Sequence, residues 1–200
     1  NVSAETPSKV VMDAAGNAIA AWHQGNSLYY NVFSASSGWG GAVQVDTNAV
    51  DSVFNARLRL VMTPAGRAVA IWNSGVFAVK SMQYTPGAGF SAPVLVNSYG
   101  INTQLGLDAE GNAVVVYVAP DRWPNPTTGS DVYSRRLAWG GSWSNATPVE
   151  PLDGLGAQAF AAFNAAGQGV VAWISGDVAG TNRHFVVWDD PHKKPCYLFA

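Results

Sequence analysis

The chain is 200 residues long, enough for one domain of ordinary size or two small ones. Its formal charge is −2, with 12% charged and 48% hydrophobic residues. A nucleic-acid-binding protein would carry a basic stripe, and a disordered chain would lack this apolar content, so neither class fits. No apolar run reaches the ~18 residues that a membrane-spanning segment needs.

One sequence unit recurs four times along the chain. Each copy starts with Asp, Thr or Asn, has Gly three positions later, and has Trp or Tyr six positions after that Gly, over 13–22, 63–72, 108–117 and 164–173. A side-chain oxygen at the first position can accept a hydrogen bond from the backbone two residues on, and Pro64 suits the second position of a type I turn. We therefore predict four β-hairpin turns, each closed by a left-handed glycine, and no phosphate-binding loop.

Short apolar segments flank these turns. They precede the turns at 10–12, 60–62, 105–107 and 161–163, and follow them at 18–22, 68–72, 113–117 and 169–173. A third segment comes next in every unit (28–33, 77–84, 132–137 and 184–188), and three units add a Gly-aromatic turn and a fourth segment (42–45, 93–96 and 148–149). Apolar residues at consecutive positions indicate strands that are covered on both faces. Four such strands per ~50 residues are typical of a β-propeller blade.

The predicted fold class is therefore all-β, a propeller of four-stranded antiparallel blades. It forms a single domain over 1–190, with repeats at about 7–50, 51–100, 101–152 and 153–190. The fourth repeat lacks an evident outer strand, so we expect segment 1–4 to complete the last blade, which would remove exposed sheet edges. Residues 191–200 are expected to form a C-terminal tail. Four blades shared in a larger ring, or a homo-oligomer, are alternatives that the sequence leaves open.

The four units resemble the blades of bacterial secreted propellers of the sialidase-like and propeller-lectin kind. The sialidase Asp-box reads Ser/Thr-x-Asp-x-Gly-x-x-Trp, whereas Asp13 lies three positions before Gly16 and the aromatic residue comes later. The resemblance thus covers nearly the whole chain, but it concerns the hairpin role of the box and not its exact residue types and spacing. It implies the fold and leaves the activity open, because propellers host many unrelated functions.

The resemblance to sialidases also implies what a catalytic site would contain. Sialidases place three arginines on the substrate carboxylate, with a Tyr–Glu nucleophile pair and an Asp acid, in rings of six blades. No arginine of this sequence stands in a context that matches that triad: Arg57, Arg59, Arg67, Arg122, Arg135, Arg136 and Arg183. We therefore expect no catalytic residue, and an enzyme only as a sialidase-like glycoside hydrolase.

Two sets of aromatic residues recur at repeat positions. Trp22, Trp72, Tyr117 and Trp173 are expected to pack between blades, because each ring buries 150–250 Å². Trp39, Phe90 and Trp143 follow a Gly at an outer hairpin and are expected to be partly exposed. Exposed aromatic rings stack on sugars, so this second set is the candidate ligand-binding set, with a clamp over the blade edge as the alternative.

The third unit contains an insertion at 119–129, where Arg122 and Trp123 are further candidate ligand-binding residues. Strand alternation places Arg135 and Arg136 on opposite faces, so at most one of them joins Arg122. The chemistry of metal sites is not indicated, because the spacing of His184, Asp189, Asp190 and His192 matches no metal motif. No cofactor is expected, and Cys196 is expected to be a free thiol.

The sequence favours a non-catalytic ligand-binding propeller whose partner is a glycan or another small or extended ligand. Secretion or a periplasmic location is expected. A sialidase-like glycoside hydrolase, a degenerate relative of one, and a protein-interaction scaffold are the alternatives. Equivalent pockets, each with an aromatic wall, would favour the lectin-like function. Arginines that converge with a Glu-paired Tyr would favour the hydrolase, and a broad apolar face would favour the scaffold.

Overall fold

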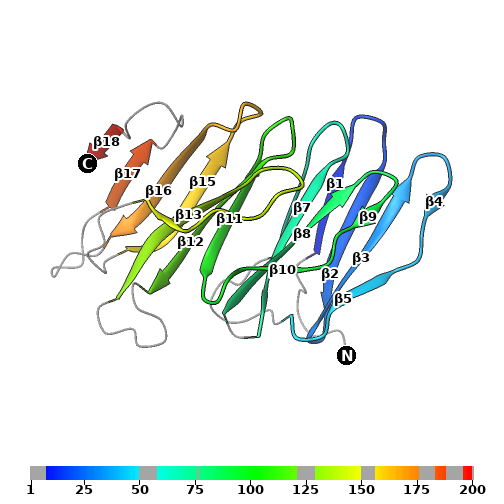
Figure 1. Cartoon of the computed structure of the whole chain (residues 1–200), viewed down its shortest axis with the longest axis horizontal. Helices are drawn as coiled ribbons and strands as arrows, with labels where there is room; N and C mark the ends of the chain where they lie inside the picture. The colour runs from blue at the N-terminus through cyan, green and yellow to red at the C-terminus, as the bar shows by residue number, and fades with distance from the viewer. Residues whose placement is uncertain are drawn as a thin grey trace. The chain divides into compact units, whose positions relative to one another are not determined.

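The computed structural model describes residues 8–49, 58–75, 77–120, 129–149, 156–175, 183–187 and 196–199. The chain divides into two compact units, Asn1–Ser98 (unit 1) and Tyr99–Ala200 (unit 2). All of the regular secondary structure in the described ranges is β-strand (Figure 1). The strand expected at 1–4 lies outside the described residues.

Unit 1 contains two antiparallel sheets, which we call blade 1 and blade 2. Blade 1 is formed by β1 (Ser8–Met12), β2 (Ala18–Gln24), β3 (Ser27–Ser34), β4 (Gly38–Trp39) and β5 (Val43–Asp46). Blade 2 is formed by β6 (Arg59–Met62), β7 (Ala68–Ser74), β8 (Ala78–Thr85), β9 (Gly89–Phe90) and β10 (Val94–Asn97). In both sheets the first three strands pair in chain order.

Unit 2 contains the other two antiparallel sheets. Blade 3 is formed by β11 (Ile101–Leu107), β12 (Ala113–Pro120), β13 (Ser130–Leu137) and β14 (Thr147–Pro148). Blade 4 is formed by β15 (Gly156–Phe163), β16 (Gly169–Ser175), β17 (Arg183–Val187) and β18 (Cys196–Phe199). The predicted all-β class with four antiparallel sheets is confirmed.

The fourth sheet corrects one expectation. Cys196–Phe199, assigned above to a tail, pairs with β17 from His184↔Phe199 to Val187↔Cys196. This strand takes the outer position that the sequence analysis gave to segment 1–4. The physical reason is that a four-residue apolar run can complete a backbone ladder, even where a basic and proline-containing stretch precedes it.

The outer edge of the blades differs from the prediction in detail. The residues expected to form Gly-aromatic turns, 38–39 and 89–90, form the short strands β4 and β9. These strands pair with the C-terminal ends of β3 and β8. The next strands, β5 and β10, pair with the N-terminal parts of β3 and β8, and each of these two pairings contains a shift in register. In blade 3 the equivalent contact is a single bridge between Leu137 and Trp143. The outer strand of these blades is therefore interrupted.

The four predicted hairpin turns are confirmed. In each one the glycine donates to the carbonyl three residues earlier, at 2.9–3.2 Å, as in Gly66 N–H to Thr63 O at 2.9 Å. The four glycines have φ between 77° and 90°. Only glycine adopts this left-handed conformation without steric cost, so the motif is a type I turn closed by a bulge. In Figure 1 the β1–β2 and β6–β7 turns lie at the same end of unit 1.

The cores lie between the blades of each unit. In unit 1, Ile19, Ala21 and Leu28 of blade 1 pack with Ala70 and Trp72 of blade 2. In unit 2, apolar residues of blades 3 and 4 do the same: Val116, Val118, Val132, Val149, Ala159, Val171 and Trp173. Of the repeated aromatic residues, Trp72, Tyr117 and Trp173 are buried as predicted, whereas Trp22 is half-buried.

Candidate functional site

A backbone hydrogen bond joins the hairpin turns of the two blades in each unit. In unit 1 the Ala14 N–H donates to the Pro64 carbonyl at 3.0 Å, and in unit 2 the Ala109 N–H donates to the Ala165 carbonyl at 2.8 Å. The four residues occupy the same position in their turns. Pro64 has no N–H and serves only as the acceptor. The same backbone bond therefore joins the two blades of both units.

The first blade of each pair has an Asp–Asn turn that braces a neighbouring loop. Asp13 accepts from the Asn17 backbone N–H (2.8 Å) and from Asn17 Nδ2 (2.9 Å), and Asn17 Oδ1 accepts from the Ala35 N–H (3.1 Å). Asp108 and Asn112 repeat this arrangement, with Trp139 N–H as the donor to Asn112 Oδ1 at 2.9 Å. These bonds fix the carboxylates at the turns and explain why Asn follows the glycine in these two repeats.

Each pair of blades encloses a cleft beside its joined turns. The cleft of unit 1 (cleft 1) has a volume of about 300 Å³, and that of unit 2 (cleft 2) about 270 Å³. Nine lining positions are equivalent by strand register. The pairs are Asp13/Asp108, Asn17/Asn112, Ala18/Ala113, Ile19/Val114, Val32/Arg136, Phe33/Leu137, Ser34/Ala138, Met62/Phe163 and Gly66/Gly167. The fold thus builds the same cleft twice.

Cleft 1 combines a carboxylate with a phenol and apolar walls. Tyr84 lines it together with Asp13, Phe33 and Met62. Burial raises the pKa of Tyr84, and the nearby Tyr30 and Asp13 add to the effect, so its hydroxyl stays protonated at neutral pH. The Asn17 side chain, opposed only in part by burial, lowers the pKa of Asp13, so that group is ionised. The cleft therefore offers a hydroxyl donor, a carboxylate acceptor and aromatic rings.

Cleft 2 has a different aromatic wall and a cation. Phe163 lines it, and its ring packs so closely on Gly106 and Gly169 that a Cβ on either glycine would overlap the ring. Arg136 stands where cleft 1 has Val32. Its neighbour Arg135 pairs with Val115 and donates from Nε to the Tyr117 hydroxyl at 3.3 Å. The predicted opposite orientation of the two arginines is confirmed, since Arg136 alone of the two lines the cleft.

The three predicted ligand-binding aromatics occupy one register position but different surroundings. Trp39 is 54% exposed and packs edge-on against Phe33, with ring centroids 5.3 Å apart. Phe90 is partly buried in the unit 1 core, edge-on to Tyr30 of blade 1 (4.6 Å) and to Tyr84 (5.1 Å).

Trp143 is half-buried opposite Leu137. Each member of the set therefore neighbours a cleft-lining residue: Phe33, Tyr84 or Leu137. None of the three lines a cleft itself. The other two predicted ligand-binding residues, Arg122 and Trp123, lie outside the described residues.

The sequence analysis missed Tyr84, Met62 and Phe163 as site residues, because it read the strands only as core. A signal was present. Aligning blade 1 with blade 3 and blade 2 with blade 4 separates the Asp–Asn turns from the Thr–Arg and Asn–Gln turns. That alternation distinguishes the first blade of each unit from the second. It therefore indicates which residues of the two blades face each other across the cleft.

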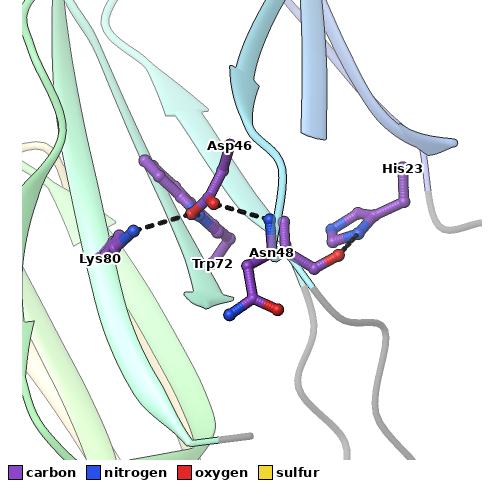
Figure 2. Close-up of polar contacts among 6 residues, drawn as sticks. His23, Asp46, Asn48, Trp72 and Lys80 are labelled. Atoms are coloured by element: carbon purple, nitrogen blue, oxygen red, sulfur yellow. Dashed lines mark hydrogen bonds and ion pairs between the residues drawn. The ribbon is translucent and has the colours of Figure 1, made fainter. Parts of the chain in front are cut away.

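A polar cluster at the other end of unit 1 ties its two blades together (Figure 2). Asp46 is buried and accepts from Trp72 Nε1 at 2.8 Å, from Lys80 Nζ at 3.1 Å and from the Asn48 N–H at 2.9 Å. Burial alone would raise the pKa of Asp46, but these bonds and one from Ser74 outweigh it and lower the pKa to about 2. Such a carboxyl holds no proton at neutral pH, so Asp46 is a hydrogen-bond acceptor between the two blades and not a general acid.

Beside this cluster, His23 Nδ1 donates to the Ala49 carbonyl at 3.2 Å (Figure 2).

No group of three or more His, Cys, Asp or Glu residues that could hold a metal ion occurs among the described residues. In the same ranges no helix has the length and apolarity to cross a membrane.

No family model matches the sequence, and no curated protein matches it. Solved structures do. The chain aligns with the GH93 α-L-arabinofuranosidase of Fusarium graminearum in complex with arabinobiose over 96% of its length, with a TM-score of 0.57 and 10% identity. It aligns with the Penicillium chrysogenum α-L-arabinanase complexed with arabinobiose over 99%, with a TM-score of 0.55 and 11% identity. A triple arginine-to-alanine mutant of AofleA from Arthrobotrys oligospora matches over 96%, with a TM-score of 0.57 and 9% identity.

These matches establish the fold as a β-propeller. The chain spans 65% of the arabinofuranosidase, 67% of the arabinanase and 57% of AofleA. It thus corresponds to about two thirds or less of each of these proteins.

Proposed function

We propose that the chain is a carbohydrate-binding propeller module that holds a saccharide in each of its two equivalent clefts. The observation that carries this proposal is the duplication itself: nine lining positions recur, with a hairpin carboxylate, an amide and an aromatic wall in both copies. Sugar recognition uses this combination, because hydroxyl groups bond to carboxylates and amides while the C–H face of the ring packs on an aromatic side chain. A secreted or periplasmic location is part of the same proposal.

The volumes and the neighbours support a small saccharide. Clefts of about 300 Å³ are at the lower end of ligand pockets. The arabinofuranosidase and arabinanase structures each contain arabinobiose, so arabino-oligosaccharides are the first probes, followed by a broad glycan array. Release of reducing sugar in the same samples would instead support the hydrolase alternative.

The test blocks one cleft at a time. Ser34 and Ala138 line the two clefts at equivalent positions, so Ser34→Trp should fill cleft 1 and Ala138→Trp should fill cleft 2. Ser37 is exposed and lines neither cleft, so Ser37→Trp is the matched control. Calorimetry should give two sites per chain for the control, one for each blocked variant and none for the double variant.

Two results would contradict the proposal. One is silence across the array with a folded protein. The other is an unchanged number of sites when both clefts are blocked. If Trp39→Ala abolishes binding that Ser34→Trp leaves intact, the exposed ring of Trp39 is the binding surface in place of cleft 1.

A further inference from the structure

Blade 1 has an apolar face that is open within unit 1. Its opposite face, which includes Val11 and Ile19, packs against blade 2. Side chains alternate between the two faces of a strand, so Val10, Met12 and Trp22 point away from blade 2. Val10 is 65% exposed, Met12 is 63% exposed and Trp22 is half-buried. We call these three residues the front face. Contiguous apolar surface of this kind marks an interaction site.

The residues at the same positions of the second blades are covered. Counted from the hairpin turns, the front face of blade 1 corresponds to Leu60, Met62 and Trp72 of blade 2, and to Ala161, Phe163 and Trp173 of blade 4. Leu60 is 6% exposed and Trp72 is fully buried, because both belong to the core between blades 1 and 2. Trp173 is buried in the same way between blades 3 and 4. The front face of blade 1 is therefore one half of an interface that the fold forms twice.

Blade 4 has the other half of this interface on its open face. Phe160, Ala162 and Val170, which we call the back face, alternate with residues such as Phe163 that pack against blade 3, so they point away from that blade. Phe160 is 55% exposed and Val170 is 49% exposed. The equivalent of Val170 in blade 1 is Ile19, which is fully buried against blade 2.

The back face is more apolar than its covered counterparts. Phe160 stands where blade 1 has Lys9 and blade 3 has Gln104. In unit 2 that glutamine donates from Nε2 to the Ala159 carbonyl of blade 4 at 3.3 Å. None of the six residues of the front and back faces is charged. A phenyl ring in place of a polar side chain is favourable where the ring is removed from water, so this composition fits a covered face.

The two open faces match each other as the covered faces do within a unit. In unit 2, Gly106 of blade 3 lies against the Phe163 ring of blade 4. The equivalents of these two residues are Ala162 in the back face and Met12 in the front face. Unit 1 has valine and methionine at the same two positions, both packed in its core, so alanine and methionine fit there as well.

We propose that two copies of the chain associate head to tail, with the back face of blade 4 in each copy packed on the front face of blade 1 in the other. A second copy is the occupant because the interface needs one front face and one back face, and each copy has one of each open. Two such contacts, related by a two-fold axis, leave neither face open. Two copies of four blades supply eight, within the four to eight that are typical of propellers, whereas three copies would supply twelve. This association does not depend on carbohydrate binding.

Light scattering of the full chain measures the assembly. The unchanged chain should have the mass of two chains. Val10→Asp in the front face and Val170→Asp in the back face should each raise the dissociation constant at least about hundredfold, because each assembly would then bury two carboxylates without a partner. Val43 is a 45% exposed valine of β5 that belongs to neither face, so Val43→Asp is the matched control and should keep the two-chain mass.

Disulfide trapping locates the contact. Met12→Cys and Ala162→Cys are combined in a chain that also carries Cys196→Ser, and mild oxidation should link two chains. The equivalent pair of residues touches in unit 2, so the introduced thiols should meet. Met12→Cys with Val43→Cys is the control pair and should leave the chains unlinked.

Each outcome decides one point. A one-chain mass for the unchanged protein at every accessible concentration overturns the proposal. A two-chain mass that survives both aspartate variants overturns the assignment of the two faces. A disulfide within one chain shows that the faces meet in the same copy and overturns the second copy as the occupant, and masses that keep growing with concentration overturn the closed pair. Thermal unfolding of dilute samples compares Val10→Asp with Val43→Asp, and the disulfide test decides the question if an aspartate variant does not fold.

Discussion

Units 1 and 2 build the same cleft with different side chains. In unit 2 a large ring, Phe163, packs on Gly106 and Gly169. In unit 1 the equivalent position of the ring is Met62, and the positions of the two glycines are occupied by Val11 and Ala68. Apolar bulk that is smaller at one position is larger at the two others. The comparison teaches that one backbone arrangement accommodates different side chains at equivalent positions.

A second difference concerns the buried Trp of the second blade. Trp72 donates to Asp46, which lies opposite Leu28. In unit 2 the equivalent of Leu28 is Val132, whose carbonyl accepts from the Val149 N–H. Val149 thus takes the place of Asp46, and it belongs to the same apolar cluster as Trp173. One unit therefore joins its blades through a buried carboxylate and the other through apolar contact.

The largest effect should come from filling the space that the Phe163 ring occupies beside Gly106. Gly106→Val places a side chain where the Phe163 ring lies, and we expect it to lower the free energy of unfolding by about 3 kcal/mol. The triple variant Gly106→Val, Phe163→Met, Gly169→Ala installs the unit 1 combination and should return to within about 1 kcal/mol of the unchanged chain. Urea unfolding measures both. A triple variant as unstable as the single one would show that the two solutions are not interchangeable.

Replacing the carboxylate of unit 1 should have the next largest effect. Asp46→Val imports the side chain of unit 2 but leaves the indole N–H of Trp72, a fully buried residue, without its acceptor, so we expect a loss of about 2–3 kcal/mol. Asp46→Asn retains an acceptor and is the control, with a smaller loss. Equal losses in urea unfolding would show that the charge, and not the hydrogen bond to Trp72, carries the effect.

The same residue predicts a pH dependence. Its pKa is about 2 in the folded chain, against 3.8 when unperturbed, so the unfolded chain binds more protons between these values. The contribution of Asp46 is complete above about pH 4 and is lost as the pH falls toward 2. The difference in unfolding midpoint between the unchanged chain and Asp46→Asn should therefore shrink between about pH 4 and pH 2. A difference that stays constant over this range would exclude an ionised Asp46 as its source.

A smaller effect separates the first and second blades of a pair. Asn112→Ala removes the bond to Asp108 and the acceptor for the Trp139 N–H, and should cost about 1–2 kcal/mol. Gln168 holds the equivalent position in blade 4, is exposed, and accepts from Asn164 Nδ2 in the same turn at 2.9 Å. Gln168→Ala should therefore cost less than about 0.5 kcal/mol. Equal costs in urea unfolding would remove the distinction between the two kinds of turn.

The smallest effect concerns the backbone bond between turns. Ala14→Pro removes the N–H that donates to Pro64 while keeping a turn that already accepts proline in blade 2, so we expect a loss of about 1 kcal/mol. Ala165→Pro is the control, because the bond uses the Ala165 carbonyl. It should leave stability unchanged or raise it slightly. The two unfolding free energies measure the bond, and their equality would mean that it contributes nothing.

Much of the fold could be predicted from local signals. Asp13, Pro64 and Gly66 dictate their turns through rotamer and backbone preferences that need no partner. Burial of Trp72 follows from an apolar strand. The clefts could not be predicted in this way, because they arise where residues about 50 positions apart meet, such as Asp13 and Gly66. Phe90 shows the same limit: its place in the repeat was predicted, but its contact with Tyr30 of another blade was not. The strand at Cys196–Phe199 was missed because its pairing partner lies across a linker.

The bond from Ala14 to Pro64 has one more consequence. Both partners are peptide groups, so apart from proline at the donor no substitution removes the N–H or the carbonyl that forms it. The alignment of the two turns is thereby insulated from changes in their side chains. Cleft-lining residues such as Val32 and Arg136 can then differ while the walls around them keep their spacing. If the two units descend from a common pair of blades, their main-chain geometry should show this more clearly than their side chains do.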